Sequence, residues 1–125
     1  MRIVVLGGAG KMGAIAVEDL VANHRVGEVI LADRDMEGAA AIAEYLDSPK
    51  LSITESDLND HAALVALLRR ADACVNATVY YTNLKVMEAC IEAGTHYTDM
   101  GGLFHGTLKQ LELGDRFAEA GISAV

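Results

Sequence analysis

Glycines gather near the start of the chain, and an aspartate follows them at a spacing typical of nucleotide-binding proteins. Gly8, Gly10 and Gly13 form a Gly-x-Gly-x-x-Gly motif, and Asp33 comes 20 residues after the last of them. Such glycines let the backbone turn tightly (Gly8), approach a pyrophosphate (Gly10) and bring a helix close to a strand (Gly13). An aspartate at this distance accepts hydrogen bonds from ribose hydroxyls. The pattern therefore predicts a dinucleotide site.

Elements of the right type flank this motif. The apolar run at residues 3–6 predicts a strand buried on both faces, and residues 11–23 have apolar side chains at helical spacing. A second apolar run, 29–32, ends at Asp33. Together they predict a β-α-β unit in which the pyrophosphate faces the helix N-terminus and the positive end of its dipole. The expected cofactor contacts in this unit are Gly8, Ala9, Gly10, Lys11, Met12, Gly13, Asp33 and Arg34.

Glycine-rich turns also occur in P-loops and in α/β domains without a cofactor. A P-loop is excluded because Met12 stands where a Ser or Thr would bind magnesium, and Val5 occupies the place of the upstream glycine. A turn without a ligand is disfavoured, since clustered glycines cost conformational entropy on folding.

Asp33 and Arg34 favour different cofactors. A carboxylate at the ribose attracts two hydroxyls and repels a 2′-phosphate, whereas a guanidinium pairs with that phosphate. We predict NAD on account of Asp33, with NADP as the alternative that Arg34 supports. A solvated Arg34, or one stacked on the adenine, fits NAD equally well.

The remaining chain alternates helix and strand patterns without a linker or repeat. Expected helices cover residues 36–46, a stretch with inward-facing Leu64, Leu67 and Leu68, 82–93 and 107–120; expected strands cover 51–54, 73–76 and 96–99. The length suits one domain, residues 1–125. The fold predicted is a doubly wound parallel α/β sheet (Rossmann fold) with strand order 3-2-1-4-5-6, the chain ending within the sixth strand.

Polar and small residues follow the third and fourth predicted strands. Ligands of such sheets lie at the carboxyl ends of the strands, near the switch point between the first and the fourth. Asp57 and Leu58 are expected beside the adenine, and Asn76, Ala77 and Thr78 beside the ribose and nicotinamide. Asp57 is equally well explained as a turn or capping residue. Asn76 ends an apolar strand, so its amide needs partners from a cofactor or from loop backbone.

Side chains able to exchange protons follow the fourth and fifth strands. Tyr80, Asp99 and His105 are candidates for catalysis, although loop packing, turn capping and solvation respectively explain them better. Tyr81 and Lys85 have the Tyr-x-x-x-Lys spacing of short-chain dehydrogenases. We attribute that spacing to chance, because in those enzymes the pair lies further from the glycine turn and follows a serine partner. No cluster of His, Cys or acidic residues has metal-ligand spacing.

Charge and composition exclude several classes of partner. The net charge of −8 argues against nucleic acid and against an anionic membrane surface. No apolar run approaches the roughly 20 residues that span a bilayer, and no signal peptide is visible, so a cytoplasmic location is expected. Cys74 and Cys90 are expected to be buried thiols in a reducing compartment, not a disulfide.

Two segments resemble a known family: NATVYYTN at residues 76–83 and CIEAGTHYTDMGG at residues 90–102. They are similar to the N-terminal domain of the saccharopine dehydrogenase-like family, most of all its lysine 6-dehydrogenase branch, and the likeness extends over nearly the whole chain. It implies NAD(P)-dependent oxidation at the amine-bearing carbon of lysine or a lysine-derived amine. In that family a second domain supplies most of the substrate pocket and the dimer contacts. This chain alone is then expected to bind dinucleotide without turning over an amino-acid substrate.

Two other classes stay open at this point. A non-catalytic NAD-sensing regulatory domain, such as those that gate potassium channels, fits the length and the single glycine motif. The tyrosine-rich loop after the fourth strand and the glycine pair at residues 101–102 favour a nicotinamide site instead. A purely structural α/β module is the third class. An incomplete sixth strand would leave an exposed edge, which favours a homodimer.

Overall fold

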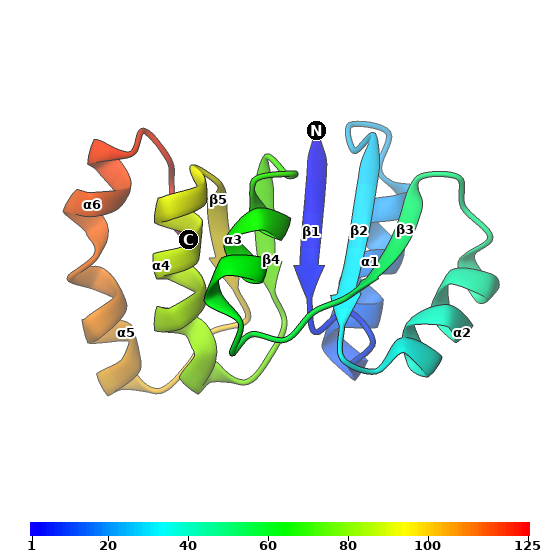
Figure 1. The fold of residues 1–125 in the computed structure, drawn as a ribbon, viewed down its shortest axis with the longest axis horizontal. Helices are drawn as coiled ribbons and strands as arrows, with labels where there is room; N and C mark the ends of the chain where they lie inside the picture. The colour runs from blue at the N-terminus through cyan, green and yellow to red at the C-terminus, as the bar shows by residue number, and fades with distance from the viewer.

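Five parallel strands form one sheet through the middle of the molecule (Figure 1). The computed structural model describes residues 1–125 and gives the order β3-β2-β1-β4-β5, with every neighbouring pair parallel. The strands are β1 (Arg2–Leu6), β2 (Glu28–Asp33), β3 (Leu51–Glu55), β4 (Ala73–Asn76) and β5 (His96–Asp99). Helical crossovers join them, as parallel strands require. The predicted doubly wound α/β class is confirmed.

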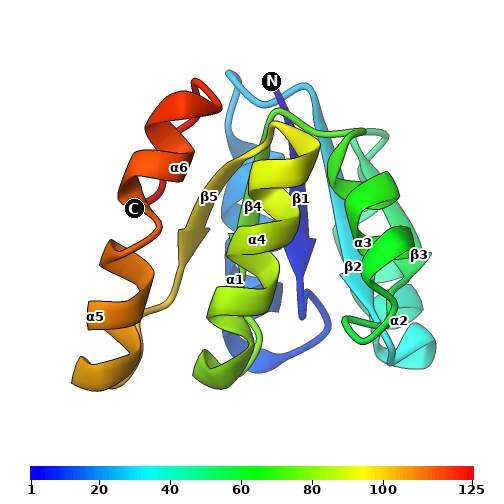
Figure 2. The same cartoon turned by 60° about the vertical axis from the view of Figure 1, so that its left-hand side comes forward.

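Helices cover both faces of this sheet (Figures 1 and 2). They are α1 (Lys11–Ala22), α2 (Met36–Leu46), α3 (His61–Leu68), α4 (Asn83–Ala93), α5 (Phe104–Leu111) and α6 (Gly114–Glu119), with the short 3-10 helix η1 (Tyr80–Thr82) before α4. Helices α1 and α2 lie on one face and α3 and α4 on the other, with α5 and α6 beside α4. None of them combines the length and the apolar character that crossing a membrane demands.

The apolar core is divided by the sheet into two clusters. Fifteen buried residues lie on the side of α3, α4 and α6, and seven on the side of α1 and α2. Strand β1 contributes to both, because Val4 and Leu6 face the larger cluster while Ile3 and Val5 face the smaller one. The uninterrupted apolar run at the start of the chain is thus buried on both faces, as predicted.

The prediction of a single helix over residues 107–120 is wrong. The structure has α5 and α6 instead, separated at Glu112 and Leu113, where Leu113 N–H donates to the Gln110 carbonyl oxygen at 3.1 Å. The break redirects the chain so that Phe117 reaches the larger cluster and Leu113 packs against it. Gly114, a poor helix former, follows directly and favours the interruption.

The expected sixth strand is reduced to one β-bridge. Ala124 pairs in parallel with Tyr97 of β5, with Tyr97 N–H donating to Ser123 O at 2.9 Å and Val125 N–H donating to Tyr97 O at 3.0 Å. The bridge lies beside β5, where the order 3-2-1-4-5-6 puts a sixth strand, but the sheet itself ends at β5.

Candidate dinucleotide-binding site

The glycine turn between β1 and α1 is built from close backbone contacts. The motif predicted that Gly8 makes the tight turn. In the structure the left-handed conformation lies at Gly7 (φ +72°), so Gly7 makes the turn instead. A Cβ at Gly8 would lie 2.6 Å from Leu31 Cγ, so Gly8 is required by packing against β2. A Cβ at Gly13 would overlap the Gly7 carbonyl oxygen, which agrees with the predicted close approach of α1. Gly10 lies in a more open place, with only that oxygen nearby at 3.3 Å.

Helix α1 begins with free backbone donors. Its N-cap residue is Gly10, which offers no side-chain cap, and the N–H groups of Lys11, Met12 and Gly13 have no acceptor in the protein. Unpaired N–H groups and the positive end of the helix dipole together stabilise an anion. The start of α1 therefore fits a phosphate group.

Asp33 at the end of β2 is fixed by two backbone donors. Its Oδ2 accepts from Ala9 N–H at 2.9 Å and its Oδ1 from Asp35 N–H at 3.0 Å. These bonds tie the glycine turn to the end of β2 and leave each oxygen a further lone pair for a ribose hydroxyl. Arg34, the next residue, is exposed, and its side chain makes no hydrogen bond or ion pair.

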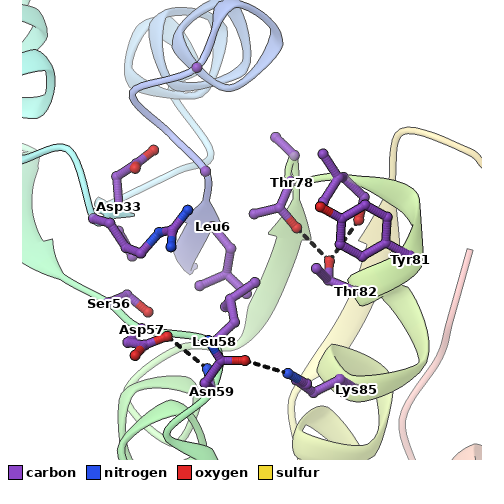
Figure 3. Close-up of a pocket in the computed structure, with 16 residues that line it drawn as sticks. Leu6, Asp33, Ser56, Asp57, Leu58, Asn59, Thr78, Tyr81, Thr82 and Lys85 are labelled. Atoms are coloured by element: carbon purple, nitrogen blue, oxygen red, sulfur yellow. Dashed lines mark hydrogen bonds between the residues drawn. The ribbon is translucent and has the colours of Figure 1, made fainter.

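A cavity of about 550 Å³ opens at the carboxyl ends of the strands, a volume within the range of ligand pockets. Figure 3 shows Asp33 on one side of it and Thr78, Tyr81 and Thr82 on the other. Its lining residues come from the last residues of β1 and β2, from the connections that follow β1, β2, β3 and β4, and from the first turn of α4: Leu6, Gly7, Gly10, Ala32, Asp33, Arg34, Ser56, Asp57, Leu58, Asn59, Ala77, Thr78, Val79, Tyr81, Thr82 and Lys85. The glycine turn, the acidic strand end and the cavity therefore adjoin one another, as a dinucleotide requires.

The connection after β3 is held to α4 across one end of the cavity. Asp57 Oδ1 accepts from Asn59 N–H at 2.9 Å, so the turn role considered for Asp57 is present, and Asp57 lines the cavity as well. Lys85 Nζ donates to Asn59 Oδ1 at 2.9 Å (Figure 3). Lys85 and Arg34 are the two cationic side chains of the lining, and neither is paired with a carboxylate.

Hydrogen bonds within the protein satisfy Asn76. Its Oδ1 accepts from the Thr78 hydroxyl at 2.6 Å and from Thr78 N–H at 3.3 Å, and its Nδ2 donates to Asn83 Oδ1 at 3.0 Å. Loop backbone thus supplies one of the expected partners. Asn76 is buried beneath the loop after β4 and does not line the cavity.

The structure brings together most, but not all, of the predicted contacts. The cavity is lined by the predicted Gly10, Asp33, Arg34, Asp57, Leu58, Ala77 and Thr78. Outside its lining lie Gly8, Ala9, Lys11, Met12, Gly13 and Asn76. Sequence reasoning missed Gly7, Ser56, Asn59, Val79, Tyr81, Thr82 and Lys85. Tyr81 and Lys85 could have been noticed from their Tyr-x-x-x-Lys spacing, although that spacing is typical of short-chain dehydrogenases and was attributed to chance.

The three candidates for catalysis lie outside the cavity lining. Tyr80 packs edge-on against Tyr81 with ring centroids 5.6 Å apart, and His105 is exposed beside Phe104. Asp99 Oδ1 accepts from Gly101 N–H at 2.7 Å, so the turn capping expected of it is present.

Asp99 Oδ2 accepts from three side chains: Asn83 Nδ2 at 2.9 Å, Tyr97 Oη at 2.8 Å and Gln110 Nε2 at 2.6 Å. Burial raises the pKa of the Tyr97 phenol well above its usual value, and the adjacent Asp99 carboxylate adds to the rise. This phenol therefore stays protonated and serves as a hydrogen-bond donor.

The fold and the cavity define a dinucleotide-binding domain, and comparison with known proteins gives its family. Residues 3–125 match the family described as "Saccharopine dehydrogenase NADP binding domain". The chain belongs to this family, and the resemblance found in its sequence is confirmed.

Individual proteins are similar to this chain in sequence or in fold. Carboxyaminopropylagmatine dehydrogenase of Synechocystis sp. is 29% identical over the whole chain, which covers 33% of that protein. Glutamyl-tRNA reductase of Haloquadratum walsbyi is 33% identical over 73 residues, 58% of the chain and 14% of that protein. Apo saccharopine dehydrogenase (L-Glu forming) from Saccharomyces cerevisiae shares the fold, with a TM-score of 0.83 and 23% identity over 98% of this chain and 26% of its own. The chain thus spans a third or less of these relatives.

Proposed function

We propose that the chain binds NAD in the cavity at the carboxyl ends of its strands, as the cofactor domain of an oxidoreductase that acts on the C–N bond of lysine or a lysine-derived amine. The observation that carries the cofactor proposal is the Asp33 carboxylate, which Ala9 N–H and Asp35 N–H hold at the rim of the cavity. The amine class rests on the family and on its resemblance to the lysine 6-dehydrogenase branch.

Residues in the cavity and at the adjoining start of α1 offer groups that suit each part of NAD. Gly10 and the free N–H groups of Lys11–Gly13 would hold the pyrophosphate, and Asp33 the adenosine ribose. Arg34, Asp57 and Leu58 would border the adenine, and Ala77 and Thr78 the nicotinamide ribose. When bound, the nicotinamide supplies the acceptor for a hydride.

The choice of NAD over NADP rests on how firmly the two neighbouring charges are held. The Asp33 carboxylate is fixed by two backbone hydrogen bonds, and its charge repels a 2′-phosphate. The Arg34 side chain is exposed and has no fixed partner. Pairing it with a 2′-phosphate would therefore cost the conformational entropy of ordering that side chain. The family's description names NADP, so the test below compares the two nucleotides directly.

A sensing domain without chemistry is the second candidate. It is favoured by one observation: none of Tyr80, Asp99 and His105 lines the cavity. On this alternative the site would recognise the adenosine diphosphate part of its ligand, and the nicotinamide would add nothing to affinity.

Titration calorimetry with NAD, NADP and ADP-ribose separates these readings. We expect NAD to bind about tenfold more tightly than NADP, since one repelled charge is worth about 1.4 kcal/mol at such a site. We also expect no NADH formation by the chain alone with lysine. Absence of binding by all three nucleotides would refute the proposal, tighter binding of NADP would refute the NAD preference, and ADP-ribose binding as tightly as NAD would favour the sensor.

A further inference from the structure

A chain of side-chain hydrogen bonds runs from the end of β5 to the wall of the cavity. Asn83 Nδ2 donates to Asp99 Oδ2 at 2.9 Å, and Asn76 Nδ2 donates to Asn83 Oδ1 at 3.0 Å. The Thr78 hydroxyl donates to Asn76 Oδ1 at 2.6 Å, and Thr78 N–H donates to the same oxygen at 3.3 Å. Asn76 and Asn83 are almost completely buried, and Thr78 lines the cavity.

The direction of every bond in this chain follows from Asp99. An ionised carboxylate only accepts hydrogen bonds, so Asn83 must turn its Nδ2 toward Asp99 and its Oδ1 toward Asn76. Asn76 must then present Nδ2 to Asn83 and Oδ1 to Thr78. The Asp99 carboxylate on β5 therefore determines that Asn76 turns its Oδ1, and not its Nδ2, toward the N–H and hydroxyl donors of Thr78.

We propose that Asn83 and Asp99 are positioning residues of the dinucleotide site, which act through Asn76 to fix Thr78 and the loop after β4 without touching the ligand. This inference rests on the proposed function, because it concerns the wall expected to border the nicotinamide ribose. Fully satisfied buried networks hold one arrangement, since any other leaves a polar group unpaired at substantial cost. The same network includes Gln110 of α5, whose Nε2 donates to Asp99 at 2.6 Å, so it also anchors α5 to this loop.

An exchange of side chains between positions 83 and 99 tests the network directly. Asn83→Asp puts two carboxylates in contact where Asn83 Nδ2 now donates to Asp99. The double variant N83D/D99N reverses the pair: the amide at position 99 donates to the carboxylate at position 83, which still accepts from Asn76 Nδ2. Gly101 N–H keeps an acceptor at position 99, and Gln110 rotates its amide to present an oxygen. The Tyr97 hydroxyl loses Asp99 Oδ2 as its acceptor, so the double variant should be less stable than the parent. The bonds to Thr78 therefore survive in the double variant and are strained in the single one.

We would measure the affinity of the whole chain and its variants for NAD and for AMP by calorimetry. We expect N83D to bind NAD about tenfold more weakly, in the range of measured coupling energies, with AMP affinity nearly unchanged because AMP does not reach Thr78. We expect N83D/D99N to recover NAD affinity to within about threefold of the parent. Thr95→Val is the control: it removes a buried hydroxyl that donates to Leu68 O at 2.8 Å, far from the cavity, and should lower stability without changing either affinity.

The outcomes separate this inference from the function on which it rests. A parent chain that binds neither NAD nor AMP contradicts the proposed function itself. A parent that binds both, with a folded N83D variant of unchanged NAD affinity or with equal losses for NAD and AMP, overturns the positioning role alone. If N83D does not fold, Asn83→Ala removes the hydrogen bonds to both Asp99 and Asn76 without adding a charge, and a selective loss of NAD affinity is expected of it as well.

Discussion

At the scale of single residues, the sequence predicted those parts of the site that depend on local spacing. Asp33 could be found because one β-α-β unit fixes the distance from the glycine turn to the end of the second strand. Asn59 and Lys85 could not, because they meet only after α3 and α4 have packed side by side. The turn was assigned to Gly8 because the motif names the residue but not its φ angle, which the structure gives to Gly7.

The first prediction concerns the charge of Asp33. Asp33→Asn keeps the size of the side chain but replaces one acceptor by a donor that faces Ala9 N–H or Asp35 N–H. We expect the affinity for NAD to fall by about tenfold or more, because hydrogen bonds to charged groups contribute about 1.5–3 kcal/mol. We also expect the affinities for NAD and NADP to become more nearly equal, because the charge that repels the 2′-phosphate is gone. Calorimetry with both nucleotides measures this.

A matched control for this substitution lies on the adjacent strand. Glu55 pairs in register with Asp33 but does not line the cavity. Glu55→Gln should leave both affinities within twofold of the parent, by the small effect typical of an exposed charge. Equal losses in D33N and E55Q would show that net charge, not a contact of Asp33, governs binding.

At the scale of elements, apolar periodicity identified every strand and most helices, because burial sets that periodicity. It failed over residues 107–120, where Leu108 and Leu111 continue the helical pattern but are exposed in α5. A pattern of apolar residues does not reveal which of them reach the core. The core is reached by Leu113 and Phe117, and this requires the break between α5 and α6.

The second prediction compares one substitution in two helices. Gly13→Ala places a Cβ against the Gly7 carbonyl oxygen, a backbone atom that cannot move aside cheaply. We expect the free energy of unfolding to fall by about 2 kcal/mol or more, as for other overpacked sites. In α5, a Cβ added at Gly106 has no atom within 4 Å. Gly106→Ala should therefore raise the free energy of unfolding by about 0.5–1 kcal/mol, because alanine has the higher helix propensity. Urea unfolding measures both, and a Gly13→Ala variant as stable as the parent would contradict the close approach of α1 to the turn.

At the scale of the whole molecule, the order of the first five strands followed from the dinucleotide-binding motif, because the fold that carries this motif has the order 3-2-1-4-5-6. The sixth strand, which the sequence predicts to be incomplete, is present only as the single bridge between Ala124 and Tyr97. The two cysteines are both free and buried in the larger cluster, in agreement with their expected state.

The third prediction uses these thiols to report on global opening. Burial raises the pKa of the Cys74 thiol, so its reactive thiolate is scarcer at any given pH than in an unfolded chain. We expect a disulfide reagent at pH 8 to modify neither cysteine of the folded chain on a timescale of minutes, and to modify both in concentrated urea. Rapid reaction of one thiol in the native chain would indicate local opening near β4 or α4.

Helix α2 buries fewer residues completely than its counterparts on the other face of the sheet. It buries Ala39 completely and no other residue, whereas α4 buries five, and it begins directly after the segment that carries Asp33 and Arg34. A ligand held by that segment must also meet the entropic cost of keeping α2 in place. We therefore expect substitutions in α2, which does not line the cavity, to change nucleotide affinity through the preorganisation of this segment.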